Sequence, residues 1–110
     1  MFPFEKVLDQ KIRNRLDEKF IPPLGDFDPE LQVAWFVPRG ITSKKTKNGK
    51  EYWIVEVIDS TSQTTKIKCW GIKPGNNVLH LNRPYMAKLD YDPQWGFSSR
   101  SIRHNFRLLG

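Results

Sequence analysis

The chain has 110 residues and a formal net charge of +6, which is enough for one domain with one hydrophobic core and too little for two independent domains. Its 38% hydrophobic and 27% charged residues are typical of a folded soluble protein and exclude a disordered or membrane chain. No apolar run approaches the roughly 20 residues that cross a bilayer, and the first residues lack the pattern of a secretion signal. We therefore expect a cytosolic protein without a membrane partner.

The charge is distributed unevenly along the chain. Residues 1–30 contain five basic and seven acidic side chains, a balance of −2, whereas residues 31–110 contain 13 basic and 5 acidic side chains, a balance of +8. An acidic leader thus precedes a basic domain, and this pattern favours a polyanionic partner for the second part. A charge that only keeps the protein in solution is the alternative.

Side chains for disulfide, metal or covalent chemistry are sparse. Cys69 is the only cysteine, so no internal disulfide forms, and His80 and His104 lack the spacing of metal ligands. Alternation along its strand points the Cys69 thiol inward, where it is unreactive. The five carboxylates of the basic segment belong to different predicted elements, which disfavours a nuclease-like cluster. We therefore predict a protein that is not an enzyme, with no catalytic residue, no metal and no cofactor.

Residues 3–20 are predicted to form an amphipathic helix. Pro3 suits the first turn of a helix, and Pro22 and Pro23 end it because proline lacks the amide donor. Its apolar side chains recur at helical spacing and are Phe4, Val7, Leu8, Ile12, Leu16 and Phe20. A helix of this kind covers an open side of the domain or docks another protein, and the sequence leaves both open.

From Leu31 onward, turn signals separate short β-segments at intervals of about 10–15 residues, as in barrels and sandwiches. We predict strands over about residues 32–46, 52–58, 64–70, 83–91 and 96–103. Pro38 predicts an edge position or a bulge in the first strand, and Gly40 predicts a sharp bend. Asn48-Gly49 predicts a hairpin turn after this strand. Residues 71–77 contain too much glycine and proline for a long helix.

Four aromatic residues of these strands are expected to pack within the protein. Trp53 and Tyr85 are predicted core residues. Because Trp35 and Phe36 are adjacent, one of them is expected to face inward and the other to meet the helix.

Five strands with a longer link between the third and the fourth follow the β-β-β-link-β-β order of the OB-fold, a partly open Greek-key barrel. The stretch 39–59 adds a more specific pattern: glycine, aliphatic and polar residues, a basic run with Thr46-Lys47-Asn48-Gly49-Lys50, and an alternating strand that ends at Asp59. This stretch resembles the first hairpin of the OB domains in bacterial-type replicative DNA polymerase III alpha subunits and in the anticodon-binding family. The resemblance covers roughly residues 33–72, and the last two strands only by topology. It departs from the family in the turn after the second strand, which has no glycine.

The resemblance implies a mainly β fold, a five-stranded OB-type Greek-key barrel over residues 31–110. The helix and proline-rich linker of residues 1–30 would pack on this barrel. It also implies a single-stranded nucleic-acid-binding module associated with DNA replication, in a bacterial or phage-infected cell near the nucleoid, with replication proteins as further partners. A polymerase needs a palm domain that this chain does not contain, so the resemblance concerns an accessory module.

The candidate site follows from strand alternation. If Val55, Val57, Ile67 and Cys69 point into the barrel, their neighbours on strands 2 and 3 point outward, onto the face where OB-folds usually hold ligands. This face combines cations for phosphates with rings for unstacked bases. The predicted nucleic-acid-binding residues are Lys44, Lys45, Lys47, Lys50, Tyr52, Ile54, Lys66, Lys68, Trp70, Trp95, Arg100 and Arg103.

Alternatives to single-stranded DNA binding are open at this point. An anticodon-type RNA binder would use the same side chains, since nothing in the sequence identifies a contact to the 2′-hydroxyl. A protein-interaction adaptor would use the strand 2–3 face or the helix for a protein partner. Two purely structural alternatives are also open: Tyr52 and Trp70 could pack under the N-terminal helix, and the lysine run could be a solvated hairpin tip.

Overall fold

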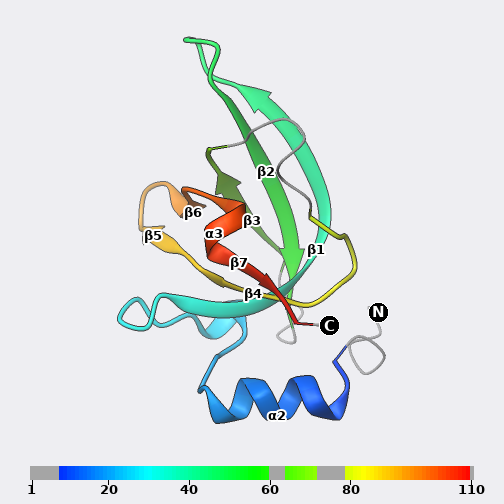
Figure 1. The fold of residues 1–110 in the computed structure, drawn as a ribbon. Helices are drawn as coiled ribbons and strands as arrows, with labels where there is room; N and C mark the ends of the chain where they lie inside the picture. Colours follow the sequence, from blue (N-terminus) through cyan, green and yellow to red (C-terminus); the bar gives the residue numbers. More distant parts are fainter. Residues whose placement is uncertain (1–7, 60–63, 72–78, 110) are drawn as a thin grey trace.

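The computed structural model describes residues 8–59, 64–71 and 79–109, and this part of the chain is mainly β (Figure 1). The strands are β1 (Val33–Lys45), β2 (Glu51–Ile58), β3 (Thr64–Cys69), β4 (Tyr85–Lys88), β5 (Asp90–Asp92), β6 (Gly96–Ser99) and β7 (Phe106–Leu108). The helices are α2 (Gln10–Glu18), the 3-10 turn η1 (Leu24–Asp26) and α3 (Ile102–Asn105). The predicted mainly β fold is confirmed. No described helix is long and apolar enough to cross a membrane.

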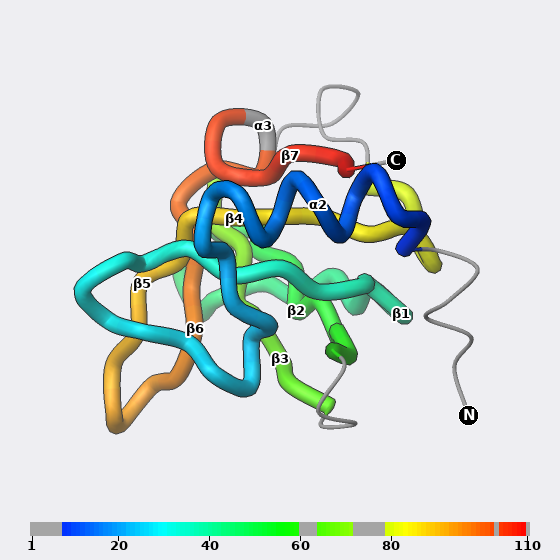
Figure 2. Tube along the Cα trace, turned by 90° about the horizontal axis from the view of Figure 1, so that it is seen from below, coloured from blue at the N-terminus to red at the C-terminus, as the bar shows by residue number. Residues whose placement is uncertain are grey.

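The strands form one curled sheet in the order β5-β6-β3-β2-β1-β4-β7. The long strand β1 serves two neighbours, because residues 37–45 pair with β2 and residues 33–36 pair with β4, both antiparallel. On the other side β3 pairs antiparallel with β2 and parallel with β6. A single residue, Leu89, separates β4 from β5, so the chain passes directly from one side of the sheet to the other and the sheet is barrel-like (Figures 1 and 2).

The prediction of five strands is wrong, because the described residues form seven. The predicted strand 83–91 is divided at Leu89, where the chain leaves β1 and joins β6 as its neighbour. The predicted strand 96–103 ends at Ser99, because Ser101 begins α3 as its N-cap and accepts a hydrogen bond from the His104 amide. After α3, β7 adds to the free edge of β4.

The first hairpin agrees with its sequence signals. The register between β1 and β2 shifts between Pro38 and Gly40, which confirms the predicted bulge. Gly49 has a φ of 82°, a backbone conformation that favours glycine, and the amide of Thr46 donates to the carbonyl of Lys50 at 2.9 Å. This turn closes the hairpin beyond the body of the sheet, at the top of Figure 1.

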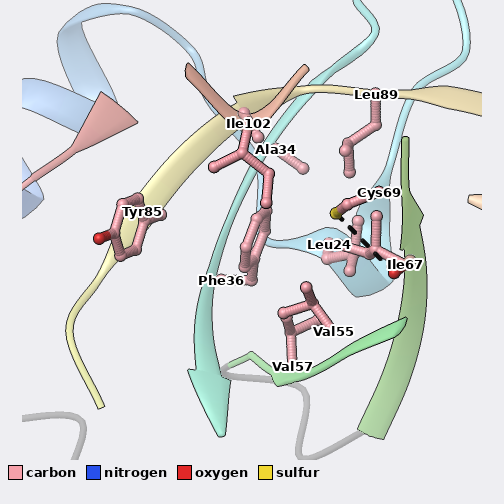
Figure 3. Packing of buried hydrophobic residues seen from close by; sticks show 11 residues of the cluster. Leu24, Ala34, Phe36, Val55, Val57, Ile67, Cys69, Tyr85, Leu89 and Ile102 are labelled. Carbon is pink, nitrogen blue, oxygen red and sulfur yellow. Dashed lines mark hydrogen bonds between the residues drawn. The ribbon is translucent and has the colours of Figure 1, made fainter. Parts of the chain in front are cut away.

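The hydrophobic core fills the inside of the curled sheet (Figure 3). Val55, Val57, Ile67 and Cys69 are fully buried, which confirms the predicted inward set, and Phe36 packs beside them. Two helical segments, η1 and α3, also contribute to this core through the buried side chains of Leu24 and Ile102. Tyr85 is also buried, as expected, and Trp53 is half-buried against the core.

The N-terminal helix packs over the outer side of β1. Its N-cap Asp9 accepts a hydrogen bond from the Ile12 amide at 2.9 Å, and the helix ends at Glu18. Ile12 and Leu16 are buried in a second cluster with Trp35 on β1. Trp35 therefore meets the helix while the adjacent Phe36 enters the core, as alternation predicts.

The predicted helix, residues 3–20, is longer than α2. Residues 3–7 lie outside the described part of the chain. Phe20, which the spacing places on the apolar stripe, is instead 82% exposed because the helix has already ended and its φ is 54°.

Candidate nucleic-acid interface

The outer face of β1, β2 and β3 carries the side chains that alternate with core residues such as Val55 and Ile67. Cross-strand pairs fix their arrangement, because Lys44 lies opposite Tyr52 and Ile54 lies opposite Lys68. We call the following set the lysine-aromatic face: Lys44, Lys50, Tyr52, Ile54, Lys66, Lys68, Trp70 and Trp95. The structure thus brings together most of the predicted binding residues.

One end of this face is a stack of two rings with a cation beside it. Tyr52 and Trp70 stack with their centroids 4.6 Å apart and their planes 29° apart. The ammonium nitrogen (Nζ) of Lys50 lies 5.3 Å from the centroid of the Trp70 ring. Stacking and cation–π contacts restrict the rotamers of all three side chains before any ligand binds. Both rings lie on the open sheet face rather than under α2, where the alternative placed them.

The position of Trp70 depends on the end of β6. The Trp70 amide donates to the carbonyl of Ser99 at 2.8 Å, which continues the parallel pairing of β3 and β6 by one residue. Gly71 follows with a φ of 69°, and its α-carbon lies against the backbone of Arg100. Trp70 is therefore held by backbone contacts at the place where β3 and β6 end.

The other end of the face is formed by the turn between β5 and β6. Asp92 accepts hydrogen bonds from the amides of Gln94 and Trp95 at 2.7 and 3.1 Å, and these bonds fix the turn. Trp95 is 66% exposed, and the Lys68 Nζ lies 5.3 Å from the centroid of its ring. A lysine and an aromatic ring are thus paired at this end too, which brings the turn onto the β3 side of the face.

A hollow of about 300 Å³ lies on the same face where β1, β2 and β3 meet. Lys44, Ile54 and Lys66 are among the residues that line it. Ile54 supplies an apolar surface, and the two ammonium groups supply positive charge next to it. The Glu56 carboxylate also lines the hollow and offsets part of this charge. An unstacked base and the phosphate beside it require the combination of apolar surface and positive charge.

The carboxylates of Glu56, Asp90 and Asp92 share the face, and they lower its net charge. Glu56 lies opposite Lys66 across the β2–β3 pair. Asp90 lies opposite Ser98, which in turn lies opposite Lys68. Sequence analysis missed Asp90, although alternation with the buried Leu89 along residues 83–91 would have placed it outward.

Of the predicted binding residues with described side chains, three do not belong to the face, and a fourth is not described. Lys45 is exposed but alternates with Lys44, so it lies on the opposite side of the hairpin, beside Glu51. Lys47 is exposed in the hairpin turn, and Arg100 is exposed directly after β6. The Arg103 backbone lies in α3, and its side chain lies outside the described part of the structure.

No protein-family model, curated protein or solved structure matches this chain. The resemblance of residues 33–72 to OB domains of polymerase subunits therefore stays a prediction. The candidate site is defined by the arrangement of its own side chains.

The described residues contain no group of three or more His, Cys, Asp or Glu side chains placed to hold a metal ion. The thiol of Cys69 is fully buried, and burial raises its pKa from the ordinary 9.0 to about 12. Its position inward agrees with the prediction. A thiol with this pKa is almost entirely protonated at neutral pH and is a poor nucleophile.

The raised pKa of Cys69 gives a testable pH dependence. The folded state holds the thiol proton more tightly than the unfolded state, so this contribution to stability is complete below pH 9 and falls as the pH rises towards 12. We expect the free energy of unfolding to decrease more steeply between pH 9 and 11 in the parent protein than in Cys69→Ala, measured by urea titration. Equal slopes would contradict the assignment. Thiol reagents at pH 8 should label Cys69 only after unfolding.

Gly71 offers a second test, because a side chain there would collide with the backbone. A Cβ on Gly71 would lie 2.5 Å from the carbonyl oxygen of Arg100, whereas a Cβ on Gly49 would meet open space at a similar positive φ. We expect Gly49→Ala to cost about 1–2 kcal/mol of stability through its backbone conformation alone. Gly71→Ala should cost a further ~1–3 kcal/mol, because the contact must open. Equal losses of stability in the two variants, measured by thermal unfolding, would show that the Arg100 backbone moves away from the new side chain at no cost.

Proposed function

We propose that this protein is a non-catalytic module that binds single-stranded DNA through the lysine-aromatic face. The observation that carries the proposal is the pairing of a lysine with an aromatic ring at both ends of that face, Lys50 with Trp70 and Lys68 with Trp95. Single strands expose both phosphates and the flat faces of bases, so a ligand of this kind uses both partners of each pair. A duplex hides its base faces and would use only the lysines.

The sheet topology supports an OB-type barrel as the framework of this site. If β4 and β5 are counted as one bent strand and β7 is left aside, the remaining strands follow the β-β-β-link-β-β order of that fold. The first strand pairs with the second and the fourth, and the third pairs with the last. In OB-folds the face of strands 2 and 3 and the loop between strands 4 and 5 bind oligonucleotides. Those elements correspond here to β2, β3 and the turn that carries Trp95.

A role in DNA replication is part of the proposal and is supported by the resemblance of residues 33–72 to OB domains of replicative polymerase subunits. We propose in addition that it acts in the cytosol, near the nucleoid, with replication proteins as further partners.

A titration of fluorescent single-stranded DNA, single-stranded RNA and duplex DNA at several salt concentrations tests the proposal. We expect single-stranded DNA to bind more tightly than the duplex. The four lysines of the face predict a slope of about −3 for the logarithm of the binding constant against the logarithm of salt concentration. Lys68→Ala should reduce this slope by about 0.7. Lys11→Ala, an exposed lysine of α2 away from the face, should leave it unchanged.

Three outcomes would contradict the proposal in different ways. Tighter binding of RNA than of DNA would make the protein an RNA binder that uses the same face. Equal binding of duplex and single strand would remove the role of the rings. No binding of any oligonucleotide at low salt would favour a protein-interaction adaptor.

A further inference from the structure

A second group of basic side chains surrounds a hollow formed by β4, β7 and α3, away from the lysine-aromatic face. The hollow measures about 320 Å³. Lys88, His104 and Arg107 are among the residues that line it, and Lys88 and Arg107 are exposed. None of the described residues that line it is acidic.

The strand pairing explains why these side chains converge. Arg107 on β7 lies opposite Met86 on β4, and alternation puts Lys88 on the same outer side as Met86. Lys88 and Arg107 are therefore diagonal neighbours across the strand pair, a spacing at which their side chains reach a common point. α3 then places His104 at the rim.

The hollow differs from the lysine-aromatic face in one respect. Its aromatic residue, Phe106, is half-buried and packs edge-on against Phe36 with the centroids 5.4 Å apart. No exposed ring is available among the described lining residues. Such a site suits phosphate groups and offers no surface on which a base would stack.

The segment from β6 through α3 to β7 connects the two surfaces. β6 pairs with β3 at the lysine-aromatic face and then leads to α3 and β7 on the opposite side (Figure 2). Arg100 is exposed between them, directly after β6. Arg100, His104 and Arg107 are all exposed on this segment, which leads from one surface to the other.

We propose that the Lys88–Arg107 hollow binds phosphates of the same single strand that occupies the lysine-aromatic face. The strand passes the β5–β6 turn and Arg100 and continues to β4 and β7. This inference rests on the proposed function and extends it, because it makes the complete site longer than the lysine-aromatic face. OB-folds cover about 4–16 nucleotides, so the two surfaces together would occupy the upper part of that range.

The test compares short and long homopolymers, about 6 and about 15 deoxythymidines, which span the site sizes of OB-folds. The double variant Lys88→Gln with Arg107→Gln should bind the long oligonucleotide roughly tenfold more weakly at low salt, with a salt slope reduced by about 1.4 for two lost phosphate contacts. Its affinity for the short oligonucleotide should stay that of the parent protein. Lys11→Ala should match the parent protein for both lengths.

The short oligonucleotide separates this inference from the function on which it rests. If the parent protein binds both lengths and the double variant binds the long one unchanged, the hollow lies off the path of the strand and the inference is wrong. If the parent protein binds neither length, the proposed function itself fails. If the double variant loses the short and the long oligonucleotide equally, the two surfaces are not successive parts of one path, and the inference also fails. Loss of binding to phosphatidylserine vesicles with unchanged DNA binding would assign the hollow to anionic lipid instead.

Discussion

Replacing Trp70 by alanine is expected to weaken the binding of single-stranded DNA by about 1–3 kcal/mol, or roughly 5- to 150-fold. Trp70 stacks with Tyr52 and lies beside the ammonium group of Lys50, so its removal takes away one ring and frees two neighbouring side chains. Fluorescence anisotropy with an oligonucleotide at a fixed low salt concentration measures the loss. The salt slope should change little, because the variant keeps every lysine of the face.

Two further variants keep this prediction independent of folding. Trp70→Phe retains a ring at the same place and should recover most of the affinity. Trp95→Ala removes a ring that is 66% exposed, so it should weaken binding with almost no change in thermal stability. If Trp70→Ala and Trp95→Ala both bind as well as the parent protein, the rings are not stacking platforms, and the lysine-aromatic face attracts polyanions through charge alone.

Alternation along strands made the larger part of the fold and of the face predictable. Val55 and Val57 on one strand and Ile67 and Cys69 on the next all point inward. The residues that alternate with them must then point outward, and this follows without knowledge of the tertiary structure. The bulge at Pro38 and Gly40 and the turn at Gly49 were also predictable, because the backbone conformations that proline and glycine favour depend on the local sequence alone.

The elements that sequence analysis missed are short or depend on distant contacts. β7 has three residues, too few for a period, and it forms because the free edge of β4 is available to it. The break at Leu89 occurs because the chain pairs with β1 before this residue and with β6 after it. No residue pattern near Leu89 indicates this change of partner. Ser101, by contrast, is a visible N-cap, and it could have shortened the predicted strand 96–103.

The same distinction applies to the candidate site. Lys50 and Trp70 meet because β2 and β3 are consecutive strands that pair with each other, so the start of β2 lies beside the end of β3. Lys68 and Trp95 meet only because β3 and β6 pair in parallel, which brings a turn 27 residues away over the β3 side. Lys45 was misplaced because a run of lysines hides the alternation that separates it from Lys44.

Replacing Phe36 by alanine is expected to cost about 3–5 kcal/mol of folding stability, the largest loss from a single side chain that the core predicts. Phe36 is fully buried among residues of β2, β3 and β4 and packs edge-on against Phe106 of β7. Its removal leaves a cavity between strands that close the sheet, which cannot collapse without shifting their register. Domains of this size are stable by about 5–15 kcal/mol, so the variant should unfold at a much lower urea concentration or fail to fold at all.

Phe20 provides the matched control, because it is the same residue type at 82% exposure. Phe20→Ala should change the free energy of unfolding by less than about 0.5 kcal/mol and leave the urea midpoint almost unchanged. A comparable loss in both variants would mean that Phe20 is buried in solution. A small loss in Phe36→Ala alone would mean that the inside of the sheet is loosely packed. A tightly packed interior is needed for function as well, because only a rigid sheet holds Trp70 against Ser99 and keeps the two lysine–ring pairs at the two ends of one face.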